Sequence, residues 1–202
     1  MARPAHPVLS VERIVDEALA LFDSGEDFSM RSLAKRLGVA APSLYYHLDG
    51  LDHLVNLIRD RMVRDFPPLP PSPARPWRDE VESILRAMRD GYAAHPHLVA
   101  KLVSTPITSA PVLESYERMA VALRSAGFAA ADVGVYLEVL DSFAIGIALE
   151  RGAPSDVWHM TEATAVLAEA NEAWPDPDAR LDAAFELGLT ALLDAIAARA
   201  AQ

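Results

Sequence analysis

The chain has 202 residues, of which 51% are hydrophobic, and it carries a formal net charge of −11. It holds no cysteine, which excludes a disulfide framework and a thiolate metal site. The first ten residues lack the apolar segment of a signal peptide. No apolar run reaches the roughly 18 residues of a membrane span, so we expect a cytoplasmic protein. Abundant Ala and Leu predict an all-α fold.

The first predicted helix starts after Ser10, whose hydroxyl is a good N-cap. Apolar side chains then recur every three or four residues as far as Phe22, which predicts one buried face. Gly25 follows as a natural end of the helix.

Residues 29–48 predict a helix-turn-helix, in which a support helix and a reading helix meet at a tight turn. Ser29 caps the support helix and Gly38 ends it. Pro42 suits the first turn of the reading helix, predicted over 41–47, because that turn needs no backbone N–H from it.

The side chains of this segment suit DNA. Three cations and no acid lie between Phe28 and Leu48, and such a cationic patch in an acidic chain favours contact with phosphate. Ser, Tyr and His donate to phosphates, whereas Ala and Pro contact a thymine methyl group. A half-buried aromatic edge in an ordinary helical protein is the alternative. The residues expected to bind DNA are Ser29, Arg31, Lys35, Ala41, Pro42, Ser43, Tyr45, Tyr46 and His47.

The negative charge lies mainly outside this segment. Residues 1–65 hold eight Lys/Arg against ten Asp/Glu, and residues 66–202 hold ten against nineteen. Few cations are therefore available to release counterions from DNA, so we expect weak non-specific affinity.

A proline-rich stretch divides the chain after a fourth predicted helix. Six prolines between residues 67 and 76 exclude a helix and predict an extended linker. We therefore predict a DNA-binding domain over 1–66, a linker over 67–76 and a second domain over 77–202.

The second domain is also predicted to be helical. Helices are expected near 77–94, 96–104, 111–125, 130–150, 157–173 and 178–200. The helix at 130–150 is apolar on most of its circumference and should be buried on several sides. Gly188 in the last helix would allow a partner to approach closely. The helices at 130–150 and 178–200 are expected to form half of a homodimer interface, with packing inside one subunit as the alternative.

Apolar and aromatic residues of the second domain suggest a cavity for a small ligand. We expect Met88, Tyr92, Leu102, Met119, Phe143 and Trp158 to line it. Ordinary core packing is the alternative for each of them. Glu138 and Asp141 would pair with a ligand cation, pair with an arginine across a dimer, or lie on a solvated edge. No metal or cofactor is expected, since the two histidines of 95–97 lack carboxylate support.

Residues 10–63 resemble the DNA-binding domain of the TetR family of transcriptional regulators. The resemblance rests on L-A-x-x-L-G-V at 33–39 and S-L-Y-x-H at 43–47. It implies an all-α homodimer, with an N-terminal three-helix helix-turn-helix domain and a C-terminal helical domain for ligand binding and dimerisation. Within the family, the run of Pro42 and residues 44–47 is similar to the tetracycline-repressor-like subgroup.

Two positions depart from that subgroup. Leu51 stands where a phosphate-binding lysine is common, and Leu102 stands where a histidine holds metal-chelated tetracycline. We therefore expect weaker phosphate contacts and no metal-dependent sensing of tetracycline.

The resemblance implies a transcriptional regulator rather than an enzyme. We expect a repressor that binds double-stranded operator DNA and is released from a palindromic operator by a small apolar or amphipathic effector. An activator or a ligand-independent regulator of the same fold is the alternative. A helical enzyme is less favoured, because no nucleophile elbow, zinc-protease motif or phosphate-binding glycine loop is present.

Overall fold

The computed structural model describes residues 9–65, 75–153 and 161–200. The described residues form ten α-helices and two 3-10 helices and no strand, which confirms the predicted all-α fold. The α-helices are α1 (Val11–Asp23), α2 (Met30–Leu37), α3 (Ala41–Leu44), α4 (Leu51–Asp65), α5 (Trp77–Ala94), α6 (Val99–Val103), α7 (Ala110–Ser125), α8 (Ala130–Arg151), α9 (Ala165–Glu172) and α10 (Pro177–Ala200). The 3-10 helices are η1 (Pro96–Leu98) and η2 (Glu162–Thr164). None of these helices is long and apolar enough to cross a membrane.

Local capping fixes the first two helices as the sequence predicted. The Ser10 hydroxyl accepts the Arg13 amide at 3.2 Å and so caps α1. Ser29 and Ser32 form a reciprocal capping box at the start of α2. Gly38 ends α2 in the left-handed conformation, with φ at 71°, where a side chain would be strained.

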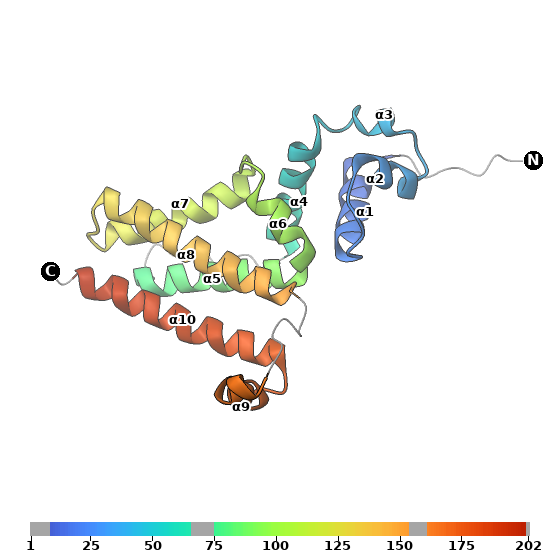
Figure 1. The fold of residues 1–202 in the computed structure, drawn as a ribbon. Helices are drawn as coiled ribbons and strands as arrows, with labels where there is room; N and C mark the ends of the chain where they lie inside the picture. The colour runs from blue at the N-terminus through green and yellow to red at the C-terminus, as the bar shows by residue number, and fades with distance from the viewer. Residues whose placement is uncertain (1–8, 66–74, 154–160, 201–202) are drawn as a thin grey trace, which may run out of the picture.

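Helices α1 to α4 surround an N-terminal core at one end of the molecule (Figure 1). Leu21, Leu33 and Leu44 are fully buried in it. Two further members of this core, Leu98 and Leu102, belong to η1 and α6, beyond the proline-rich stretch. The two halves of the chain therefore share hydrophobic packing.

Helices α5, α7, α8 and α10 form a bundle with a separate C-terminal core (Figure 1). Phe143 of α8 stacks on Phe185 of α10, with ring centroids 5.5 Å apart. A Cβ at Gly188 would lie 2.5 Å from the Phe143 ring. The close approach at Gly188 is thus made by α8 of the same chain rather than by a partner.

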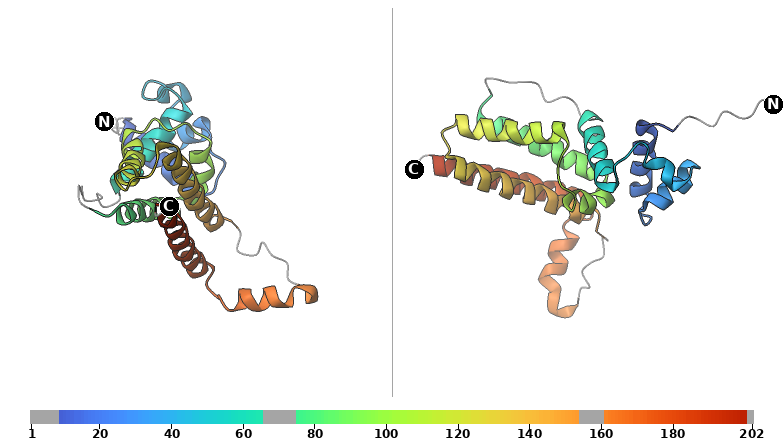
Figure 2. Two further views of the ribbon diagram at one scale, coloured as in Figure 1. Left: turned by 90° about the vertical axis from the view of Figure 1, so that its left-hand side faces the viewer. Right: turned by 90° about the horizontal axis from the view of Figure 1, so that it is seen from above.

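The region before α10 differs from the predicted helix at 157–173. The structure has η2 and the short helix α9 there, and 154–160, which includes Trp158, lie outside the described residues. Figure 2 shows α9 projecting away from the bundle. Most of the predicted linker at 67–76 also lies outside the described residues, since description resumes at Arg75.

Candidate nucleic-acid interface and ligand cavity

The predicted reading helix is shorter than expected. Helix α3 ends at Leu44 rather than at His47, and residues 45–47 form a turn. The amides of His47 and Leu48 both donate to the Leu44 carbonyl at 3.0 Å, a shared bond typical of helix ends. The physical reason is that i→i−3 bonds, from the Tyr45 amide to the Pro42 carbonyl and from the His47 amide to the Leu44 carbonyl, tighten the chain into a turn.

The residues around α3 divide into anchors and exposed side chains. Leu44 is fully buried and holds α3 to the core, and Ala41 also packs partly against the core. Tyr45 and Tyr46 are 56% and 89% exposed. His47 is half-buried.

The remaining candidates of α3, Pro42 and Ser43, come just before these two tyrosines in the sequence. Pro42 is exposed and Ser43 is half-buried. Ser43 belongs to the single turn of α3, and its amide donates to the Ala40 carbonyl at 2.8 Å.

The cations of α2 are not equivalent. The Arg36 guanidinium lies 2.6 Å from a carboxylate oxygen of Glu17 in a surface ion pair, so part of its charge is already paired within the subunit. Arg31 and Lys35 are exposed and form no ion pair with other residues in the described ranges. The Ser29 hydroxyl is occupied in the capping box. Arg31 and Lys35 are therefore the side chains of α2 with charge available to a phosphate.

The second candidate site is a cavity of about 760 Å³ between α4, α5, α6, α7 and α8. Its wall is mainly apolar and includes Met62, Ile84 and Ile145. Of the residues predicted to line a cavity, the structure places Met88, Tyr92 and Leu102 in this wall.

Two other predicted lining residues lie elsewhere. Met119 is 1% exposed and belongs to the C-terminal core. Phe143 points toward α10, where Gly188 leaves room for its ring beside Phe185. In the structure their apolar character serves core packing, the alternative that the sequence left open, and neither residue lines this cavity.

The polar groups of the cavity centre on Asp141 of α8. The Tyr116 hydroxyl donates to one Asp141 carboxylate oxygen at 2.6 Å. Burial raises the pKa of Asp141, and the Tyr116 hydrogen bond opposes that rise. Burial also raises the pKa of Tyr116, and it raises the pKa of Tyr92 to about 12. Both tyrosines are therefore neutral donors at physiological pH.

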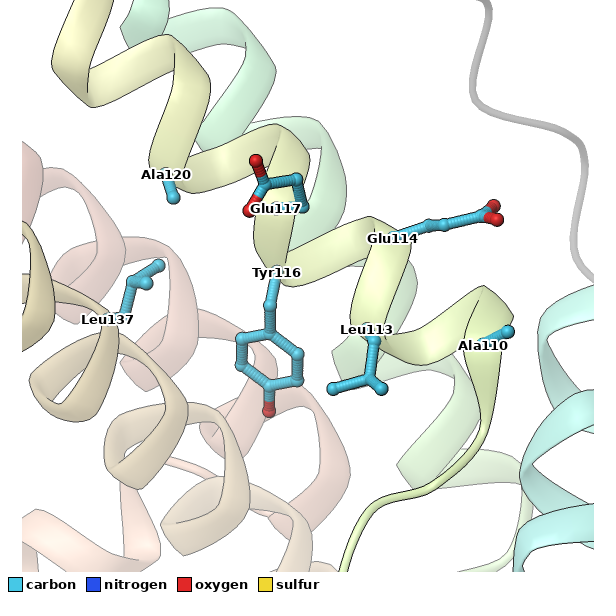
Figure 3. A pocket seen from close by; sticks show the side chains of 7 residues that line it. All are labelled: Ala110, Leu113, Glu114, Tyr116, Glu117, Ala120 and Leu137. Atoms are coloured by element: carbon cyan, nitrogen blue, oxygen red, sulfur yellow. The ribbon is translucent and has the colours of Figure 1, made fainter.

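Tyr116 also borders a smaller hollow of about 510 Å³ between α7 and α8. Figure 3 shows its ring reaching away from α7 beside Leu113, with Leu137 of α8 across the hollow. The Glu114 side chain points away from the tyrosine in the same view (Figure 3).

A buried arginine that the sequence reasoning missed joins the cavity to the N-terminal domain. Arg59 of α4 is 7% exposed and lines the cavity. Its guanidinium donates to the carbonyls of Leu102 at 2.6 Å, Thr105 at 2.9 Å and Pro106 at 3.1 Å. Desolvation lowers the pKa of Arg59.

Two neighbours of Arg59 on α4 hold the same loop. The Asn56 amide oxygen accepts the backbone amides of Thr108 at 2.8 Å and Ser109 at 3.1 Å. Asp60 accepts the Ser109 hydroxyl. We call Asn56, Arg59 and Asp60 the α4 clamp. The sequence does not show which partners these three side chains bind. Their spacing at i, i+3 and i+4, which puts them on one helical face, was the signal that could have pointed to a shared role.

An exposed aromatic helix-turn-helix clamped to a helical bundle with an internal cavity defines a two-domain helix-turn-helix protein. Residues 69–200 match the sequence model of the tetracyclin repressor-like C-terminal domain. The chain belongs to the TetR family of transcriptional regulators.

Individual relatives agree with this assignment. An HTH-type transcriptional regulator of Saccharopolyspora erythraea is 31% identical over 69% of this chain, and the match spans 60% of that relative's length. The class E tetracycline repressor of Escherichia coli is 26% identical over 92% of this chain and 89% of its own. The structure of the Streptomyces coelicolor TetR family protein ActR with (S)-DNPA superposes with a TM-score of 0.72 at 29% identity, covering 96% of this chain and 99% of ActR.

Proposed function

We propose that this protein is a homodimeric transcriptional repressor that a small amphipathic effector releases from a palindromic operator. The observation that carries the proposal is the 89% exposure of Tyr46 beside a motif that is otherwise firmly anchored. A large aromatic side chain that is 89% exposed on the turn after α3 has little packing role in the subunit, and it is well placed for a DNA backbone or base edge.

The DNA-contacting set is proposed to be Ser29, Arg31, Lys35, Ala41, Pro42, Ser43, Tyr45, Tyr46 and His47. Their expected roles differ. Arg31 and Lys35 supply charge to phosphate, whereas the tyrosines and His47 donate from α3 and its following turn. Ser29 caps α2 and Ala41 is partly buried, so these two residues are expected to contribute mainly by positioning the motif on DNA.

Dimerisation is proposed through α8 and α10. Both helices keep large apolar side chains in water in the single chain, among them Val135 at 59% exposure and Leu187 at 74%. Ala184, Ala191 and Ala195 flank Leu187 at helical spacing and would let a second α10 pack closely. A two-fold dimer would present two reading segments to half-sites about 34–36 Å apart, or a multiple of that distance.

A gel shift with DNA from the protein's own promoter region tests DNA binding. The wild type should shift the fragment at low salt, and Tyr46→Ala should weaken binding about tenfold or more while the dimer persists by light scattering. Trp174→Ala, which removes an exposed aromatic far from the motif, is the matched control. Equal binding by wild type and Tyr46→Ala would show that the turn after α3 does not contact DNA.

A further inference from the structure

The charges around the cavity are not balanced. Asp141 and Glu138 stand one turn apart on α8 and both line it. The Tyr116 hydroxyl bonds to one Asp141 oxygen, and the described residues offer no hydrogen bond to the other. The charge of Glu138 adds to that of Asp141 on the same side of the cavity.

The two arginines of the wall are already occupied. Arg118 pairs with the carboxylate of Glu80, a residue that is only 6% exposed. Arg59 directs its guanidinium to backbone carbonyls of the loop after α6. A carboxylate ligand at Arg59 would have to break bonds to the loop after α6, and one at Arg118 would compete with buried Glu80 for the same charge.

The remaining surface of the cavity suits an apolar body. Met62, Met88 and Leu102 supply flexible or branched aliphatic groups, and methionine adapts to ligands of varied shape. Tyr92 and Tyr116 offer neutral ring faces and hydroxyls. A cation beside these rings gains further attraction from their π-systems.

We propose that the effector is an amphipathic amine, with its apolar body in the cavity and its ammonium group held by Asp141 and Glu138. The inference rests on the proposed function and names the chemistry of the effector. A cation relieves the cost of a carboxylate that is partly removed from water, whereas an anion adds to it. The positive charge of Arg59 near Asp141 opposes a cationic ligand, but Arg59 is engaged by three backbone carbonyls and faces two acids.

A pair of fluorescent probes isolates the charge. Dansylcadaverine ends in an ammonium group, and dansyl-aminocaproic acid ends in a carboxylate on a chain of the same length. Fluorescence titration of the full chain should give about 10- to 100-fold tighter binding of the ammonium probe, the range expected for a hydrogen bond to a charged group.

Three variants then test the assignment. Asp141→Asn keeps an acceptor for Tyr116 and should remove most of the preference, and Glu138→Gln should remove part of it. Glu117→Gln, on a carboxylate of α7 outside the cavity wall, should change nothing. Circular dichroism establishes that the variants are folded.

The results separate this inference from the proposed function. Equal or tighter binding of the carboxylate probe, no binding of the ammonium probe, or a preference that survives Asp141→Asn would each overturn the amine proposal. A parallel gel shift reports on DNA. If the wild type binds no promoter DNA, the proposed function fails while the probe preference stands. If only the carboxylate probe releases DNA, the regulator proposal stands and the amine proposal fails.

Discussion

Replacing Arg59 by Leu should destabilise the protein strongly, because this one side chain donates to three backbone carbonyls of the loop after α6. Arg59→Leu leaves the Thr105 carbonyl without its donor, which costs about 1–3 kcal/mol. It also removes charge-assisted bonds to the carbonyls of Leu102 and Pro106, which keep the Thr105 amide and the Asn56 side-chain amide, respectively, as donors. Burying the charged guanidinium has a desolvation cost, which also lowers the pKa of Arg59. Arg59→Leu removes this cost, which offsets part of the loss. We therefore expect a net loss of about 2–4 kcal/mol in the free energy of unfolding.

Urea unfolding at one fixed protein concentration measures this loss, because dimerisation makes stability depend on concentration. At a typical urea dependence of about 2 kcal/mol/M, the midpoint should fall by about 1–2 M. Arg64→Leu, an exposed arginine later on α4, is the control and should change stability by less than about 0.5 kcal/mol. A loss below about 1 kcal/mol for Arg59→Leu would refute the view that the α4 clamp holds the two domains together.

Three further predictions follow from the packing and the charges. Gly188→Ala should lower the free energy of unfolding by about 1–3 kcal/mol, because its methyl would lie 2.5 Å from the Phe143 ring. A second change, Phe143→Leu, should recover stability in urea unfolding. A double variant no more stable than Gly188→Ala would contradict this contact. Burial raises the pKa of Asp141, so the folded protein holds this proton to higher pH than the unfolded chain, and stability falls as pH rises from about 3.9 through the raised value. Asp141→Asn should therefore be more stable than the wild type at pH 7 and lose this advantage below about pH 4; an advantage undiminished at pH 3 would rule out the titration of Asp141 as its cause. Leu187→Glu should weaken dimerisation about tenfold or more by light scattering, because it places a charge in the proposed apolar contact of α10, and a dimer of unchanged affinity would exclude this face.

The helix-turn-helix could be predicted because its signals are local. The caps at Ser10 and Ser29 and the left-handed Gly38 act within a few residues of their own positions. The end of the reading helix was harder, because the sequence carries no stop signal at Leu44, where the structure changes to i→i−3 turn bonds.

The cavity could be predicted only in part, because its wall is a tertiary property. Met88, Tyr92 and Leu102 were expected there from their apolar and aromatic character, and they line the cavity. Arg59 was missed because its partners lie more than 40 residues later in the chain. Phe143 was misplaced because the gap that receives its ring is made by Gly188 on another helix.

The shared packing of Leu98 and Leu102 sets a limit on recombining this protein with its relatives. A chimaera joined at the proline-rich stretch would give the N-terminal domain foreign side chains at these two core positions. Leu102 also lines the cavity, so the same graft would alter the recognition of small molecules. Exchanging the N-terminal domain together with residues 96–103 would keep this core intact, but it would also replace Leu102 in the cavity wall.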